Sequence, residues 1–115
     1  AGISGRKEGN TLKKIYICSP LRGDYEKNIQ KAIGYCREVA LAGDLPIAPH
    51  VYCTRFLDDT KPEERKRGLV IGTELLEMCS EVRVYGDYIS EGMQAEIRRA
   101  GALGITVRYE MGEST

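Results

Sequence analysis

Short apolar runs alternate along the chain with longer segments in which apolar residues recur at helical spacing. Four runs have the length and composition of strands: residues 14–18, 45–49, 81–86 and 105–109. Three segments have the period of amphipathic helices: residues 25–42, 62–79 and 91–103. The polar stretch 50–61 is predicted to be a loop. Strands separated by helices of this length imply parallel pairing through right-handed crossovers.

This alternation predicts an α/β fold, a small three-layer sandwich of the flavodoxin or Rossmann-like type. Its four-stranded parallel sheet is expected to have the order 2-1-3-4. Ligands of such sheets bind outside the carboxyl ends of the strands, where the strand order reverses. That crevice would be lined by residues 19–24, by residues 86–91 and by the chain from His50 onward.

The helical periods also predict which side chains face the sheet. The expected face of the first helix is Tyr25, Ile29, Ala32, Ile33, Cys36 and Ala40, and its expected stop is Gly43. The expected face of the third helix is Met93, Ile97, Ala100 and Leu103. The middle helix has two apolar stripes: Leu69, Gly72, Thr73 and Leu76, and Ile71, Leu75 and Met78. Since the sheet can cover only one of them, we expect a homo-oligomer, most simply a dimer.

The composition narrows the classes of partner. Lys+Arg and Asp+Glu both number 17, so the formal net charge is zero, and aromatic residues make up 7 % of the chain. Neither a basic patch nor a base-stacking platform is indicated, which argues against nucleic acid and anionic membranes as partners. No apolar run approaches the roughly 20 residues of a membrane span.

The 115 residues are enough for one domain, which we expect over residues 13–110. Residues 1–12 are expected to be a flexible or vector-derived tail, and 111–115 a C-terminal tail. Four cysteines lie in or next to apolar stretches, at spacings that match no zinc motif: Cys18, Cys36, Cys53 and Cys79. They predict buried, reduced thiols and a cytoplasmic location, with no metal site.

The turn after the first strand, SPLRGD, is a candidate anion cradle because it opens a helix. Ser19 can donate a hydroxyl, Arg22 can bind a phosphate through two N–H groups, and Gly23 allows close backbone approach. The alternative is a plain turn with Asp24 as the helix N-cap. One glycine does not make a dinucleotide fingerprint, so no NAD or other cofactor is expected.

The third helix carries a carboxylate on its apolar side. Glu96 lies three residues after Met93, inside the core-facing stripe, and a carboxylate there is unfavourable unless it is paired. Burial would raise its pKa and make it a candidate acid, base or nucleophile. The alternative is a marginal position with an ion pair to an arginine. Ser90, as N-cap, and Gly92 form a second helix start that can accept an anion.

Two further residues point to the same crevice. His50 is the only histidine and follows the second strand, although a lone histidine is more often structural. Tyr16 alternates with two isoleucines in the first strand, so its hydroxyl needs a partner on one face of the sheet. The mixed charge run 58–67 is expected to be a solvated loop and helix start.

Three segments together resemble the nucleoside 2-deoxyribosyltransferase-like superfamily: IYICSPLRGD (15–24), APH (48–50) and SEGMQAEIRRA (90–100). Among characterised proteins the pattern is most similar to 2'-deoxynucleoside 5'-phosphate N-hydrolases, and overall to an uncharacterised family of short bacterial and phage proteins. The resemblance covers about residues 13–109. It implies the predicted fold, a nucleoside or nucleoside 5'-phosphate ligand, a homo-oligomer and no metal.

Carried over by position, the resemblance implies that Glu96 is the carboxylate acting at the anomeric carbon and that Tyr16 positions it. The residues matching the 5'-phosphate loops are Ser19, Arg22, Gly23 and Ser90. His50 matches a pocket-lining histidine, and Asp87 roughly matches a loop that contacts the sugar. The chain departs from the family at Thr73, where the middle helix of relatives carries an Asp.

These residues leave three functions open. The first is an N-glycosidase or deoxyribosyltransferase that uses Glu96 as nucleophile or stabiliser of an oxocarbenium-like transition state. The second is a non-catalytic module that binds or senses a nucleotide in the same pocket, which Thr73 favours. The third is a bacterial or phage accessory protein that acts through its surface.

Overall fold

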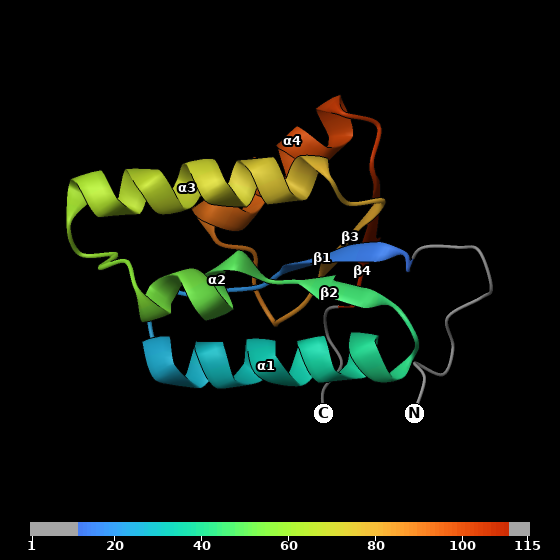
Figure 1. Cartoon of the computed structure of the whole chain (residues 1–115), viewed down its shortest axis with the longest axis horizontal. Helices are drawn as coiled ribbons and strands as arrows, with labels where there is room; N and C mark the ends of the chain where they lie inside the picture. The colour runs from blue at the N-terminus through green and yellow to red at the C-terminus, as the bar shows by residue number, and fades with distance from the viewer. Residues whose placement is uncertain (1–11, 111–115) are drawn as a thin grey trace.

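The centre of the fold is a four-stranded parallel sheet in the order β2-β1-β3-β4, in a computed structural model that describes residues 12–110 (Figure 1). Its strands are β1 (Lys14–Cys18), β2 (Leu45–Ile47), β3 (Glu81–Val84) and β4 (Thr106–Tyr109). The helices are α1 (Tyr25–Leu41), α2 (Pro49–Tyr52), the 3-10 helix η1 (Cys53–Arg55), α3 (Pro62–Glu77) and α4 (Glu91–Ala102). The predicted fold class and strand order are confirmed. The tails predicted at 1–12 and 111–115 lie outside the described residues, except for residue 12.

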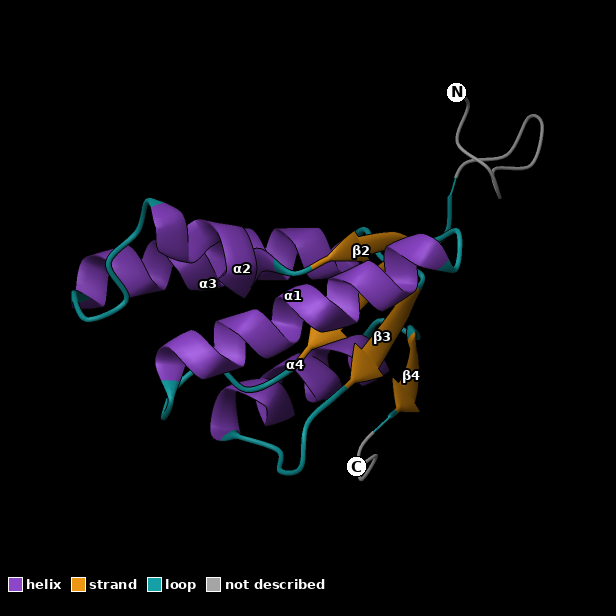
Figure 2. Cartoon of the chain, turned by 90° about the horizontal axis from the view of Figure 1, so that it is seen from below, coloured by secondary structure: helices purple, strands orange, loops and turns teal. Residues whose placement is uncertain are grey.

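The sheet is covered on both faces, with α1 on one side and α3 and α4 on the other (Figure 1), and Figure 2 shows β2 and β4 at opposite edges. Successive side chains of a strand point to opposite faces, so β1 supplies both cores. The core under α1 contains Ile15, Ile17, Val39 and Tyr85. The core under α3 and α4 contains Tyr16, Cys18, Leu76, Cys79, Val82, Val84, Met93 and Ala100. A central parallel strand buried on both faces is expected to read as a continuous apolar run, as β1 does.

The sequence prediction is wrong at the start of residues 50–61, where helix replaces loop. Pro49 lies in the first turn of α2, so β2 ends at Ile47, and η1 continues the helical path to Arg55. Proline suits this position because its φ is already helical and its missing N–H has no partner to lose. A helix of one turn is too short to show a period in the sequence. The third strand also ends earlier than predicted, at Val84 rather than Gly86.

The predicted face of α1 is correct for Ile29 and Ala32, which are buried, and for Tyr25 and Cys36, which are half-buried. Ile33 is 40 % exposed and Ala40 is exposed, whereas the buried residues are Ile29, Ala32 and Val39. One position is about 100° around a helix, so the true contact stripe is narrower than the prediction. The helix packs on β1, on the edge strand β2 and on α2.

The faces of α3 and α4 are predicted in part. Gly72 and Leu76 are buried in α3, but Leu69 and Thr73 of the same predicted stripe are exposed. The other stripe is half-buried at Ile71 and Leu75 and exposed at Met78. In α4 the predicted face is correct except at Leu103, which is 43 % exposed because it lies at the C-cap, beyond the last helical residue.

Two glycines give opposite predictions for stability. Gly86 has a φ of +106°, and a Cβ atom there would lie 2.9 Å from Cδ of Pro20. Gly86→Ala should therefore lower the free energy of unfolding by about 1–3 kcal/mol. Gly34 lies inside α1 with no atom within 4 Å of an added Cβ, so Gly34→Ala should raise it by about 0.5–1 kcal/mol. Urea unfolding of both variants measures the difference, and equal stabilities would contradict this account of the turn.

Candidate functional site

The candidate site forms where β1 and β3 end, at the point where the strand order reverses. The segments that leave these strands are the loop of residues 19–24, which opens α1, and the loop of residues 85–90, which opens α4. The chain after β2 reaches the same edge through α2, which begins with Pro49 and His50. The topology therefore brings together the three segments that the sequence singled out.

The centre of the site is a hydrogen bond between strand and helix. The Tyr16 hydroxyl donates to Oε2 of Glu96 over 2.8 Å, and Tyr16 is only 2 % exposed. Glu96 lies between Met93 and Ala100, the two buried residues of α4, so the helix aims its carboxylate at β1. The start of α4 is fixed by Ser90, whose hydroxyl accepts the backbone N–H of Met93 over 3.2 Å. The capping role predicted for Ser90 is confirmed.

Burial determines the electrostatics of this pair. It raises the pKa of Glu96, and the hydrogen bond from Tyr16 and the nearby Cys18 thiol act in the opposite direction. Burial and the Glu96 charge raise the pKa of Tyr16 well above its ordinary value, so the phenol keeps its proton and remains a donor. The Cys18 pKa is also raised by burial, and its thiol donates weakly to the Met93 carbonyl at 3.9 Å. The site thus holds one carboxylate against a protonated phenol, with a protonated thiol nearby.

A second pair lies between the first loop and α2. Ser19 Oγ and His50 Nε2 are hydrogen-bonded at 2.9 Å, and Ser19 is buried. Burial lowers the pKa of His50 to about 4, so the imidazole is neutral at pH 7. The hydroxyl of Thr54 donates to the His50 carbonyl over 3.0 Å and holds this turn of the chain. The neutral His50 imidazole therefore holds the Ser19 hydroxyl in place by a hydrogen bond.

The SPLRGD loop is held by α1 and not by its own aspartate. Asn28 donates from Nδ2 to the carbonyls of Leu21 and Arg22, over 3.1 and 3.0 Å. Asp24 occupies the N-cap position, but its side chain makes no capping hydrogen bond, so that alternative is not supported. Gly23 has a φ of +99°, a conformation that favours glycine. Asn28 was missed in the sequence because it reads as an ordinary polar residue on the outer face of a helix.

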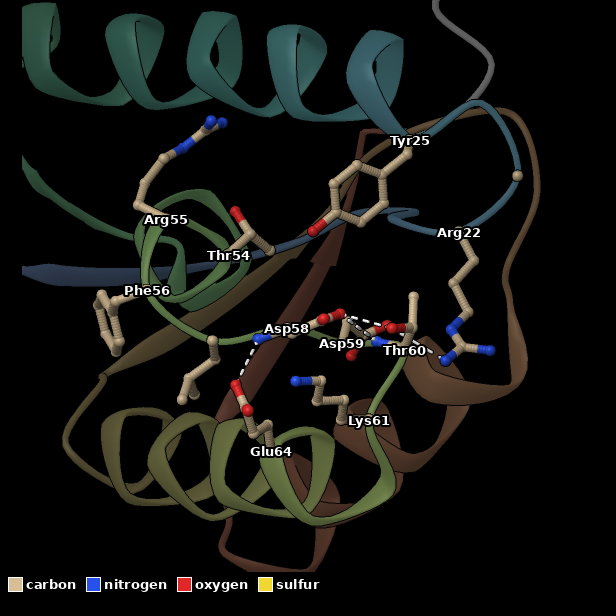
Figure 3. Close-up of a pocket in the computed structure, with 12 residues that line it drawn as sticks. Arg22, Tyr25, Thr54, Arg55, Phe56, Asp58, Asp59, Thr60, Lys61 and Glu64 are labelled. Atoms are coloured by element: carbon tan, nitrogen blue, oxygen red, sulfur yellow. Dashed lines mark hydrogen bonds and ion pairs between the residues drawn. The ribbon is translucent and has the colours of Figure 1, made fainter.

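Two cavities adjoin these loops. An open groove of about 1140 Å³ runs between the start of α1, η1 and the start of α3, and Figure 3 shows the residues that line it. Arg22 and Gly23 are the predicted site residues on its wall. Asp58, Asp59, Thr60, Lys61 and Glu64 also line it, so part of the charge run 58–67 faces a cavity. The predicted solvated loop and helix start are confirmed, since most residues of this run are exposed and α3 begins at Pro62.

A smaller cavity of about 240 Å³ lies beside the first. It is lined by Ser19, Asp24 and Asp87 of the predicted set, together with Lys27 and Lys31 of α1. Asp87 is otherwise exposed. Neither cavity is lined by the pair of Tyr16 and Glu96, which lies deeper, against the sheet.

The remaining predicted positions lie at the edges of the site. Gly92 is exposed in the first turn of α4, and an added Cβ would meet nothing within 4 Å. Thr73 is exposed on α3 and its hydroxyl donates to the Leu69 carbonyl over 2.9 Å. The α3 residue beside the site is instead Gly72, where a Cβ would lie 3.6 Å from the Tyr16 hydroxyl.

Within residues 12–110, no group of three or more His, Cys, Asp or Glu side chains is placed to hold a metal ion. Across the same residues, every helix is too short or too polar to span a membrane. The four cysteines are free, with Cys18, Cys53 and Cys79 buried and Cys36 half-buried.

Comparison with known proteins gives a family and a fold. Residues 13–110 match the family described as Domain of unknown function (DUF7768). The comparison with curated proteins found no match. A solved 2-deoxyribosyltransferase from the psychrotolerant bacterium Bacillus psychrosaccharolyticus is similar in structure, with a TM-score of 0.62 and 20 % identity. The similarity covers 89 % of this chain and 76 % of the other, so the resemblance in the sequence is confirmed at the level of the fold.

The half-buried histidine predicts a pH-dependent stability. The folded pKa of His50, about 4, lies below the ordinary value of 6.5, so the unfolded chain takes up a proton first as the pH falls. The free energy of unfolding therefore keeps its full value above pH 6.5 and falls as the pH drops toward 4. The loss is about 3 kcal/mol, at about 1.4 kcal/mol per pKa unit. Urea unfolding at pH 7 and pH 4.5 should show a larger loss in the wild type than in His50→Gln. Because the chain has one histidine, equal losses would refute the assignment.

Proposed function

The chain belongs to the DUF7768 family, and from the geometry of its site we propose that it acts on the N-glycosidic bond of a nucleoside or nucleoside 5'-phosphate. In this proposal the Glu96 carboxylate acts at the anomeric carbon. The observation that carries it is the 2.8 Å hydrogen bond from Tyr16, which holds a half-buried carboxylate in one orientation. The shared fold with a 2-deoxyribosyltransferase supports the same reaction class.

The chemistry follows from a carboxylate placed beside a sugar. As the bond between the anomeric carbon and the base breaks, its electron pair leaves with the base and the sugar gains oxocarbenium character. Glu96 then stabilises the positive charge or forms an ester with that carbon, and water or a second base completes hydrolysis or transfer. The departing base must gain a proton or a hydrogen bond from a second acid. Tyr16 acts here as the positioning residue for Glu96.

The other predicted residues have roles in binding. Arg22, with the backbone at Gly23, offers charge and close approach to a 5'-phosphate, and Ser19 offers a hydroxyl held by His50. Ser90 lies at the start of α4, where backbone N–H groups attract anions. The free cysteines fit the proposed cytoplasmic location, where thiols stay reduced.

A second candidate function is binding of the same ligand without turnover. It is favoured by the composition of α3 next to the site, where Gly72 faces the Tyr16 hydroxyl and Thr73 points away. Helix α3 therefore places no second carboxylate beside Glu96 to protonate a leaving base. The two functions predict the same binding and differ in the release of free base.

Base release tests the proposal. A panel of 2'-deoxynucleosides and their 5'-monophosphates is incubated with the wild type and with Glu96→Gln, and free base is measured by chromatography. We expect release by the wild type and a loss of about 10²–10⁴-fold in the variant. Tight binding with no release by the wild type would instead support the non-catalytic function.

The same variant carries its own control for folding. A carboxyl whose pKa is raised by burial destabilises the folded state once it is ionised, so Glu96→Gln should unfold at a higher urea concentration at pH 7. The gain should shrink as the pH falls into the ordinary titration range of Glu, where the wild type is protonated too. If Glu96→Gln loses activity but gains stability, misfolding cannot be the cause of the lost activity.

We also propose that the chain forms a dimer through α3. Three apolar side chains on α3 and its C-cap are more than half exposed: Leu69, Val70 and Met78. Light scattering should give twice the chain mass of 12.8 kDa for the wild type and a single chain for Val70→Glu. Leu41→Glu is the control, because Leu41 is 72 % exposed on α1, across the sheet. A monomeric wild type, or a dimeric Val70→Glu, would contradict this interface.

A further inference from the structure

Two loops face each other across the large groove and are joined by an ion pair (Figure 3). Arg22, on the loop that opens α1, donates from Nη2 to Oδ2 of Asp59 over 3.1 Å. Asp59 belongs to the segment between η1 and α3, 37 residues further along the chain. The guanidinium expected to meet a ligand phosphate is therefore already bound to a carboxylate of the protein.

Each of the two loops is held independently of this ion pair. On one side, Asn28 fixes the carbonyls of Leu21 and Arg22. On the other side, Asp58 accepts from the backbone N–H and the hydroxyl of Thr60, over 3.0 and 2.6 Å. The N–H of Asp58 in turn donates to Oε1 of Glu64 over 2.8 Å. These hydrogen bonds hold the turn that places Asp59 on the wall of the groove.

The pair is poorly explained as a source of stability. The Arg22 side chain is 58 % exposed and that of Asp59 is 25 % exposed, and ion pairs between such side chains contribute little to folding. Because the Arg22 guanidinium is exposed, it can exchange Asp59 for another hydrogen-bond acceptor. A carboxylate and a phosphate present the same kind of oxygen acceptors to a guanidinium, so they compete for it.

We propose that Asp59 is a specificity-determining residue that competes with the phosphate of a ligand for Arg22. A 5'-monophosphate has to displace the Asp59 carboxylate and then lies next to that negative charge. The corresponding nucleoside has no phosphate and meets neither cost. Asp59 therefore shifts the preference of the site from nucleoside 5'-phosphates toward nucleosides. This inference rests on the proposed function only for the placement of an anionic ligand at Arg22.

The size of the effect follows from the exposure of the pair. Releasing Arg22 from an exposed carboxylate should strengthen phosphate binding about two- to fivefold. Removing the Asp59 charge also removes its repulsion toward the bound phosphate. Salt screens this repulsion, because the Debye length is about 10 Å at 0.1 M. The gain should thus be larger at low ionic strength than at high ionic strength.

The test compares Asp59→Asn with Glu63→Gln. Both variants raise the net charge by one, but Glu63 is exposed in the first turn of α3 and is not on the groove wall. Calorimetric titration with inorganic phosphate, 2'-deoxyadenosine 5'-monophosphate and 2'-deoxyadenosine gives the three affinities. We expect D59N to bind the first two about two- to fivefold more tightly and the nucleoside unchanged, with E63Q like the wild type.

A double variant shows whether Arg22 carries the effect. In Arg22→Gln with Asp59→Asn, the gain in phosphate affinity should disappear. An equal gain in E63Q, a gain that persists without Arg22, or a D59N variant that binds phosphate no better than the wild type overturns the proposal. Failure of the proposed function is read separately, from base release by the wild type and its dependence on Glu96.

Discussion

The hydrogen bond between Tyr16 and Glu96 places a carboxylate against the inner face of a sheet, where an ion is stable only with a donor at hand. The donor comes from β1, the strand buried on both faces, and Tyr16 is part of the core under α3 and α4. The carboxylate comes from the buried stripe of α4. The orientation of the candidate catalytic group is therefore set by the same packing that joins the sheet to its helices. The packed core thus sets the geometry of this pair.

Much of this arrangement follows from periodicity in the sequence. Alternation in residues 14–18 puts Tyr16 on the face opposite Ile15 and Ile17, and the helical period of residues 91–103 puts Glu96 in line with Met93. Parallel topology then brings strand and helix to the same side. A single carboxylate inside an apolar stripe breaks the pattern, and such breaks tend to lie at functional sites.

What the sequence did not predict depends on contacts between distant segments or on pieces too short to have a period. The one-turn helix α2 is an example of the second kind, although it positions His50 against Ser19. The ion pair of Arg22 with Asp59 is an example of the first, because nothing in a mixed charge run says which carboxylate turns toward a loop 37 residues away. Local propensity carries no information about such partners.

The membership of Tyr16 in the core bears on how a chain of this kind can change over evolutionary time. Substituting Tyr16 disturbs the packing of the sheet on its helices, so any replacement at that position comes with a loss of stability. Glu96 is different, because burial disfavours its ionised form, and a substitution that removes the charge also removes that free-energy cost. Under the proposed function, a descendant that lost the reaction but kept ligand binding could therefore replace the carboxylate and retain the tyrosine for its packing alone.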